Sequence, residues 1–209
     1  MTDFSVTSFR VGAIQTNCYF LINNTSKELI IVDPGDEAEL ILRKITQTGC
    51  KAKAIILTHG HFDHITAVNP LKAALDIPVY AHENEKPMLD NAETDMFVPN
   101  PGHYVVNVDN YMRNEPVLEL CGFKIRVIST PGHTPGGVCY YLEEEGILFS
   151  GDTLFQNSIG RTDFPGGSYP ELIRSVEEKL FVLPEETKVY PGHEGETTIG
   201  HEKKYNPFF

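Results

Sequence analysis

The chain has 209 residues, of which 41% are hydrophobic and 22% charged, a composition that excludes wholesale disorder and suits one α/β domain. Its net charge of −12 repels phosphate backbones, so we expect no nucleic-acid partner. With no apolar run as long as a membrane span, no secretory signal and four scattered cysteines that fit reduced thiols, we expect a cytoplasmic protein that does not enter a membrane.

The first part of the chain predicts strands followed by strand–helix units. Apolar or alternating runs indicate strands at 4–10, 17–22, 29–33, 51–57 and 77–82. Helical spacing of apolar residues predicts helices at 36–48 and 64–76, and Pro70 is expected to weaken or break the second one. Residues 83–111 indicate only a short helix and a loop at 97–103, and we expect this segment to shape the mouth of a substrate site.

The pattern then restarts in the second part of the chain. Strands are predicted at 116–120, 123–130, 138–144, 146–152 and 187–193, with a helix at 169–180. Two successive halves of this kind predict an α/β sandwich with helices on the outside of its sheets. We expect residues 1–209 to form a single domain without a C-terminal helical substrate domain.

Four of the predicted strands end in, or lead directly into, side chains that can bind metal ions. These side chains are His59, His61, Asp63 and His64 in "THGHFDH", His133 in "PGHT", Asp152 in "SGDT" and His193 in "YPGHE". Because loops at the carboxyl ends of strands converge in α/β folds, we expect the four loops to meet at one point. Singly, each residue has an ordinary interpretation as a turn residue or helix cap, but five of the eight histidines fall in these loops.

The residue types fit two metal ions. His59 and His61, two apart in an extended loop, point the same way, and His133 completes a three-nitrogen set with a position open for water. The remaining residues predict a second ion, with Asp152 as the carboxylate that bridges the two. Imidazole and carboxylate without thiolate suit divalent zinc, which we expect, or iron or manganese.

Together, the motifs "THGHFDH", "PGHT", "SGDTLF" and "YPGHE" resemble those of the metallo-β-lactamase-fold hydrolases over nearly the whole chain. The resemblance implies a four-layer αβ/βα sandwich, with two mixed sheets flanked by helices and a binuclear site along one edge. It assigns His59, His61 and His133 to one metal, Asp63, His64 and His193 to the other, and Asp152 to both. Asp33 in "IIVDPG" matches the aspartate that orients a ligand histidine in this family; a turn residue before Pro34 is the alternative.

Within that family, "SGDTLF" followed by "IGRTDFPGG" and the ending "YPGHEGETTIGHEKKYNPFF" are most similar to the short glyoxalase II-like thioesterases. These resemble hydroxyacylglutathione hydrolase but lack its C-terminal helical domain. The similarity implies that a metal-bridging hydroxide attacks the carbonyl of a thioester such as S-lactoylglutathione, and that one metal stabilises the oxyanion. Asp63 would take the proton as the hydroxide adds.

The sequence departs from the glutathione-specific members at substrate contacts. Those members carry a lysine and a tyrosine where this chain has Arg161 and Asp163, and another tyrosine in place of Gly195. Arg161 is expected to bind a substrate carboxylate through its planar guanidinium, with an ion pair to Asp163 as the alternative. A small-molecule thioester is the expected substrate, and its thiol carrier stays open.

Other activities of the same fold remain alternatives. A persulfide dioxygenase would use a single iron bound by His59, His133 and Asp152, whereas the intact His61 and His193 favour the thioesterase. A lactonase keeps much the same ligands, and a periplasmic zinc β-lactamase would commonly place a cysteine near Asp152. A metal-binding regulatory protein that has lost activity is the alternative outside enzymes. The sequence predicts no oligomeric state.

Overall fold

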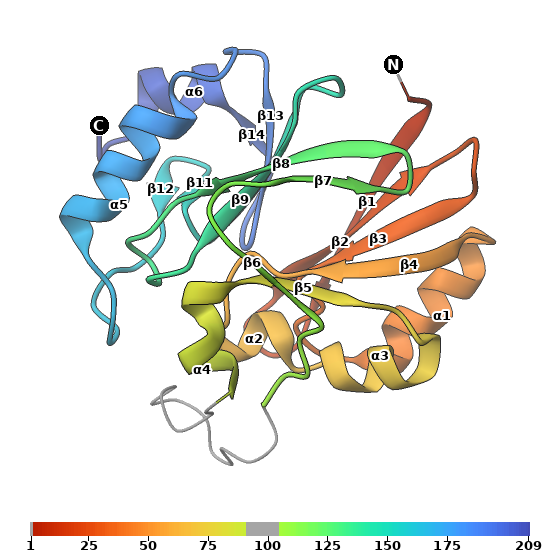
Figure 1. The fold of residues 1–209 in the computed structure, drawn as a ribbon. Coiled ribbons are helices and arrows are strands. Elements are labelled where there is room, and N and C mark those ends of the chain that lie inside the picture. The colour runs from red at the N-terminus through yellow and green to blue at the C-terminus, as the bar shows by residue number, and fades with distance from the viewer. Residues whose placement is uncertain (1, 91–104) are drawn as a thin grey trace.

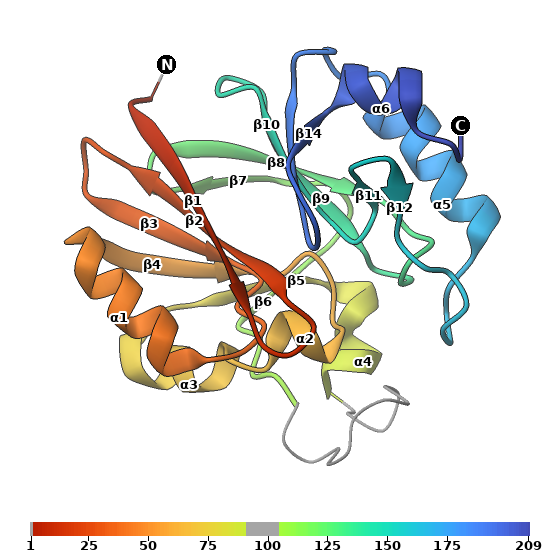
Figure 2. The ribbon, with the colours of Figure 1, turned by 180° about the vertical axis from the view of Figure 1, so that it is seen from behind.

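The computed structural model describes residues 2–90 and 105–209 and shows two six-stranded sheets packed face to face, with helices on both outer sides (Figures 1 and 2). This confirms the predicted four-layer sandwich. The predicted loop at 97–103 lies outside the described residues. Within the described ranges, no helix is long and apolar enough to cross a membrane.

The first sheet contains the strands of the first half in chain order. They are β1 (Phe4–Val11), β2 (Thr16–Asn23), β3 (Glu28–Val32), β4 (Lys51–Ile56), β5 (Val79–His82) and β6 (Asn110–Met112). β1, β2 and β3 pair antiparallel, whereas β3 to β6 pair parallel through helical crossovers. The helices of this half are α1 (Ala38–Thr48), α2 (Phe62–Ile65), α3 (Val68–Leu75), the 3₁₀ turn η1 (Glu83–Glu85) and α4 (Lys86–Asp90).

The second sheet has the order β14-β13-β10-β9-β8-β7. Its strands are β7 (Val117–Leu120), β8 (Phe123–Ser129), β9 (Val138–Leu142), β10 (Ile147–Gly151), β13 (Lys188–Pro191) and β14 (Thr197–Thr198). β7 to β10 pair antiparallel and β10 pairs parallel with β13, so β8, β10 and β13 run in one direction. A small hairpin, β11 (Leu154–Phe155) and β12 (Ser158–Ile159), follows β10, and the helices are α5 (Tyr169–Ser175), η4 (Val176–Leu180) and α6 (Ile199–Tyr205).

Three hydrophobic clusters separate the four layers. β2 is buried along its whole length because alternate side chains enter different clusters: Phe20 packs toward the helices of the first half, and Tyr19 and Leu21 pack between the sheets. On the other sheet, Tyr140 of β9 enters the central cluster, while Tyr141 packs toward α5 and η4. Strands that bury both faces lack polar alternation, which explains the uniformly apolar runs in the sequence.

Helix boundaries differ from the prediction at two places. The predicted helix 64–76 is divided into α2 and α3, and the break comes before Val68 rather than at Pro70. Pro70 occupies the first turn of α3, where its missing N–H would have no helical partner, so it fits the start of a new helix. α1 begins at Ala38 instead of residue 36 because Glu37 adopts a left-handed conformation with φ of 55°.

Candidate metal centre

All seven predicted ligand residues lie at one edge of the sandwich, where strands of both sheets end. The loop after β4 supplies His59 and His61, the following helix α2 supplies Asp63 and His64, and the loops after β8, β10 and β13 supply one residue each. The structure therefore brings together His59, His61, Asp63, His64, His133, Asp152 and His193. His59 and His193 are more than 130 residues apart in the sequence. They meet because β4 and β13 belong to two sheets that pack face to face.

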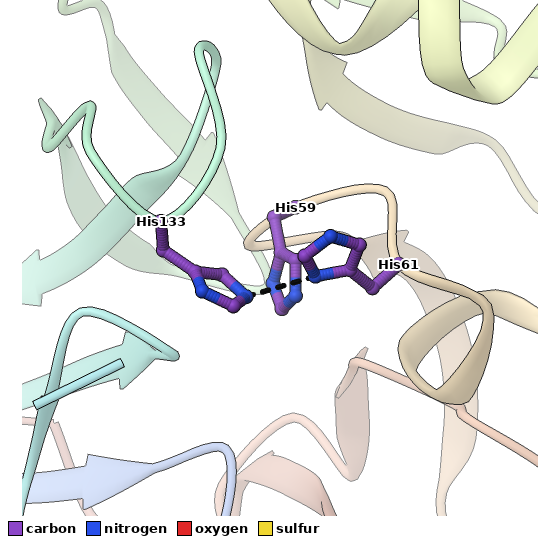
Figure 3. A group of neighbouring side chains, drawn as sticks. All are labelled: His59, His61 and His133. Atoms are coloured by element: carbon purple, nitrogen blue, oxygen red, sulfur yellow. Dashed lines mark hydrogen bonds between the residues drawn. The ribbon is translucent and has the colours of Figure 1, made fainter. Parts of the chain in front are cut away.

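The first group consists of three buried imidazoles (Figure 3). One ligand atom from each of His59, His61 and His133 lies within 4.8 Å of the others, and His61 Nδ1 is 2.8 Å from His133 Nε2. Their ring planes are nearly perpendicular, at 79° to 88°. Three nitrogens that converge in this way from two sheets have the arrangement of a three-histidine metal site.

The second group contains Asp63, His64 and His193, whose ligand atoms also lie within 4.8 Å of one another. Asp63 Oδ2 is 3.3 Å from His193 Nε2 and 3.5 Å from His64 Nε2. Asp152 stands between the two groups. Its Oδ1 lies 3.3 Å from His64 Nε2, and its Oδ2 lies 3.6 Å from His133 Nε2 and 3.5 Å from His193 Nε2. A carboxylate in this position can give oxygens to two ions at once.

Three buried polar atoms of the cluster support a cation as the missing partner. Among the described residues, His59 Nε2, His64 Nε2 and Asp152 Oδ1 have no hydrogen-bond partner, since the close approach of His64 to Asp152 lacks hydrogen-bond geometry. Buried polar atoms nearly always have a partner, and a metal ion would supply one to all three. The donor set of imidazoles and carboxylates suits zinc, iron or manganese.

Asp33 contacts Nδ1 of His64, whereas Nε2 of the same ring faces Asp63 and Asp152. Asp33 Oδ2 lies 3.0 Å from His64 Nδ1 and accepts the Thr58 hydroxyl at 2.5 Å, while Oδ1 accepts the Thr58 N–H at 2.8 Å. An Asp33–His59–His64 group also lies within ligand distance, but these contacts already engage both carboxylate oxygens. The geometry therefore matches the orienting role expected for Asp33.

Two more ligand histidines also have an orienting contact. His133 Nδ1 lies 2.7 Å from the Arg161 carbonyl oxygen, which leaves Nε2 directed at the centre. His59 Nδ1 lies 3.1 Å from the Thr58 hydroxyl. Fixing one ring nitrogen determines which nitrogen keeps its lone pair for a metal.

Three polar residues at the centre were not identified from the sequence. The Thr16 hydroxyl donates to Asp63 Oδ2 at 2.7 Å, the Asn17 amide donates to the carbonyls of Pro191 and Glu194, and the Glu85 carboxylate accepts backbone N–H groups of two ligand loops. Their partners are distant in sequence or belong to the backbone, so no spacing pattern marks them.

The two groups differ in protonation. Burial, and then the neighbouring His133, lowers the pKa of His61 to about 3, so this imidazole is neutral at pH 7. At His193 burial acts in the same direction, but Asp152 and Asp63 outweigh it and raise the pKa to about 9. The same two carboxylates raise the pKa of His64 against its burial, so a metal in the second group must displace protons from both His193 and His64 at neutral pH.

We expect zinc affinity of the second group to rise steeply between pH 7 and 9, because His193 and His64, whose pKa values both lie above the ordinary value, must lose protons to bind an ion. The three-histidine group should show no comparable dependence on His61, which is already neutral in this range. Calorimetric zinc titration of metal-free protein in two buffers of different ionisation enthalpy counts the protons released. Equal affinity of the second group at pH 7 and 9 would contradict the assignment.

A pocket opens directly beside the cluster. Its inner wall includes His61, Asp63, His133, Asp152 and His193, and its outer wall consists of Ile14, Phe62, Arg161 and Phe164. The Arg161 guanidinium lies 3.6 Å from the Phe164 ring centre and makes two 2.8 Å hydrogen bonds to the Asp163 carboxylate. The ion pair that was the alternative to a substrate contact is therefore present, and the Arg161 side chain also lines the pocket.

The chain belongs to the metallo-beta-lactamase superfamily, with which residues 11–193 match. Its curated relatives include the protein named "Probable metallo-hydrolase YqgX" from Bacillus subtilis, 42% identical over 95% of this chain and 94% of the relative. "Hydroxyacylglutathione hydrolase GloC" from Haemophilus influenzae is 38% identical over 95% and 94% of the two chains. The fold, the centre and these relatives define the chain as a member of a metallo-hydrolase enzyme family.

Solved structures of similar proteins have the same fold as this chain. The BLEG-1 B3 metallo-beta-lactamase is 42% identical with a TM-score of 0.93, covering 98% of this chain and 99% of that one. The di-iron-bound form of TTHA1623 is 38% identical with a TM-score of 0.84, covering 97% and 100%. The fold is thus shared by a protein named as a B3 metallo-beta-lactamase and by one with a di-iron-bound form.

Proposed function

We propose that the protein is a binuclear metal-dependent thioester hydrolase that acts on a hydroxyacyl thioester such as S-lactoylglutathione. The observation that carries the proposal is the position of Asp152 between two groups of ligand atoms, in a pocket that the Arg161 side chain also lines. The similarity to the hydroxyacylglutathione hydrolase GloC supports the thioester as the substrate class.

Metal ions held by the two groups would supply a nucleophilic hydroxide at neutral pH and polarise the carbonyl oxygen of the substrate. The protein's own residues then position the substrate and move the proton. Ile14, Phe62 and Phe164 offer apolar surface to the substrate at the outer wall of the pocket. Asp63, at the inner wall, is held by the Thr16 hydroxyl at 2.7 Å.

Asp63 is the residue proposed to accept the proton. Burial acts against ionisation, but His64 and hydrogen bonds from His193 and Thr16 lower the pKa of Asp63 to about 2, so it is a carboxylate at neutral pH. So weak a base holds a proton only briefly and can pass it to the departing sulfur. Because a thiolate is a good leaving group, no stronger acid is needed.

His59→Ala tests the site and the function together. Removal of one of three imidazoles should leave the first group without a bound metal, and hydrolysis of S-lactoylglutathione should fall to the background rate. Metal content per chain and initial rate, measured on one preparation, check both results. The matched control is His201→Ala, since His201 bonds Asn157 outside the centre. Full activity in His59→Ala would refute the ligand assignment.

Arg161 is proposed to bind a substrate carboxylate. Its partner Asp163 is exposed, so a carboxylate of the substrate can replace it while the guanidinium stays on Phe164. We expect Arg161→Ala to raise KM for S-lactoylglutathione roughly tenfold with little change in kcat, because the contact is equal in ground and transition states.

The control substrate for Arg161→Ala is a thioester without a carboxylate. Its KM should be the same for the variant and the unmodified protein. The Arg161 carbonyl that orients His133 belongs to the backbone and is retained in the variant. Asp163→Asn should lower KM for the anionic substrate, because it removes the competing carboxylate. Unchanged KM in both variants would eliminate Arg161 as a substrate contact.

β-Lactam hydrolysis is a second candidate because the BLEG-1 B3 metallo-beta-lactamase is 42% identical, as is the metallo-hydrolase YqgX, and has a TM-score of 0.93. A single preparation with two metals per chain that cleaves a cephalosporin but not S-lactoylglutathione would favour it. One iron per chain, with oxygen uptake on glutathione persulfide and no thioesterase rate, would instead indicate a persulfide dioxygenase.

A further inference from the structure

One buried carboxylate connects the two loops that carry the three-histidine group. Glu85 ends η1, directly after β5, and is 1% exposed. Its Oε2 accepts the N–H of Gly60 at 2.7 Å, and its Oε1 accepts the N–H of Gly136, also at 2.7 Å. Gly60 separates His59 from His61 after β4 of the first sheet. Gly136 lies three residues after His133, between β8 and β9 of the second sheet.

A side chain at Gly136 would clash with Glu85, and one at Gly60 would push against it. A Cβ at Gly60 would lie 3.0 Å from Glu85 Oε2, and one at Gly136 would lie 2.6 Å from the Glu85 backbone nitrogen. At Gly60 and Gly136 both loops therefore contact Glu85 through backbone atoms. Glycine is required here for close approach rather than for a left-handed conformation.

Burying this carboxylate is costly, and burial raises the pKa of Glu85 against the opposing hydrogen bonds. The ionised form satisfies the site best, because each oxygen then accepts one N–H and neither carries a proton that needs an acceptor. Hydrogen bonds from backbone N–H groups to an ionised carboxylate are short and strong, which matches the two 2.7 Å distances.

We propose that Glu85 is a positioning residue for the three-histidine group: by holding Gly60 and Gly136 on one carboxylate, it sets the separation of the two loops and hence of His61 and His133. His61 and His133 lie on loops that follow strands of different sheets, and their nearest nitrogens are 2.8 Å apart. Asp33 and the Arg161 carbonyl orient single rings, whereas Glu85 connects the loops themselves. The inference rests on the proposed metal centre but not on the identity of the substrate.

Glu85→Gln tests this with almost no change in volume. A carboxamide has one acceptor oxygen and a donor NH₂, so it can accept only one of the two backbone N–H groups and turns a donor toward the other. We expect zinc to bind the three-histidine group roughly 10- to 100-fold more weakly, as for other groups that support metal ligands.

The matched control is Glu202→Gln. Glu202 is likewise buried and accepts the Asn157 N–H and the Thr197 hydroxyl, but it contacts none of the seven candidate ligands in the described structure. This variant should lose a buried carboxylate of the same kind and keep its zinc affinity. If both variants weaken zinc binding equally, general destabilisation explains the effect and the inference fails.

Zinc affinity is measured on metal-free protein by competition with a chromophoric chelator. His133→Ala and His193→Ala identify which binding step belongs to which group, and Glu85→Gln should affect only the step that His133→Ala removes. If the unmodified protein binds no zinc, the proposed metal centre itself is refuted. If it binds two ions and Glu85→Gln binds them equally well, only the Glu85 inference is overturned.

Amide hydrogen exchange of the unmodified protein provides a test that does not depend on the folding of a variant. The N–H groups of Gly60 and Gly136 should exchange as slowly as those of the neighbouring strands, because both bond a buried acceptor. Rapid exchange at both positions would overturn the inference.

Discussion

Gly192→Ala should abolish metal binding although it removes no ligand. A Cβ at Gly192 would lie 2.1 Å from Asp152 Oδ1 and 2.7 Å from His64 Cε1, well inside van der Waals contact. The backbone cannot easily move away, because Gly192 N–H donates to the Gly151 carbonyl and its own carbonyl accepts the Asn17 N–H. The added methyl group must displace the bridging carboxylate and the His64 ring. We expect both metals to be lost, hydrolysis to fall to background and stability to fall by about 1–3 kcal/mol.

Metal content per chain and thermal unfolding of the metal-free protein separate these effects. The control is Gly195→Ala in the same loop, where the nearest atom to a Cβ would be Gln156 Oε1 at 3.1 Å, the end of a flexible side chain. That variant should keep its metals and its rate. A Gly192→Ala protein with two metals and a normal rate would show that Asp152 and His64 do not lie as described.

Asp33→Asn should remove the second metal selectively. Asp33 Oδ2 lies 3.0 Å from His64 Nδ1 and accepts its N–H, so Nε2 is the nitrogen that would give up its proton and offer a lone pair to a metal. The Thr58 N–H holds Oδ1 in place, so the amide NH₂ of asparagine would face His64. His64 would then accept at Nδ1 and carry its proton on Nε2, which points at Asp63 and Asp152. The reversed tautomer has no lone pair to offer the ion.

We expect metal affinity of the second group to fall roughly 10- to 100-fold and the three-histidine group to keep its ion. Asparagine tolerates the left-handed backbone of this residue, where φ is 48°, so the substitution adds no backbone strain. The control is Asp36→Asn, since Asp36 is exposed and lies, like Asp33, in the loop between β3 and α1. Two ions bound at normal affinity in Asp33→Asn would eliminate the orienting role.

The convergence of the candidate ligands could be predicted from the sequence, because histidine or aspartate stands at or shortly after the ends of four predicted strands. β8, β10 and β13 run in one direction and end at one edge of the second sheet, and the packing of the two sheets brings the end of β4 to the same place. The predicted helix at 169–180 has the correct extent. Its first part is the α-helix α5 and its second part is the π-helix η4, in which the Phe181 N–H donates to the Val176 carbonyl.

Other features leave no such pattern. Glu85 acts through backbone N–H groups 25 and 51 residues away, and Thr16 reaches Asp63 across 47 residues. β6 and β14 are too short for a periodic signal. α6 was missed because Gly200, its second residue, lowers helix propensity, although the Thr198 hydroxyl that accepts the His201 N–H is a recognisable N-cap signal.

The division of ligands between the sheets has a thermodynamic consequence. One sheet supplies His59 and His61 to the first group and Asp63 and His64 to the second; the other supplies His133 and His193, with Asp152 shared. Neither half of the chain therefore contains a complete ligand set, and a metal ion can bind fully only after the two halves have packed together. By linkage, each bound ion stabilises the contact between the halves by the free energy with which it binds. If the proposed centre binds its ions, the available metal concentration sets part of the folding equilibrium of this protein.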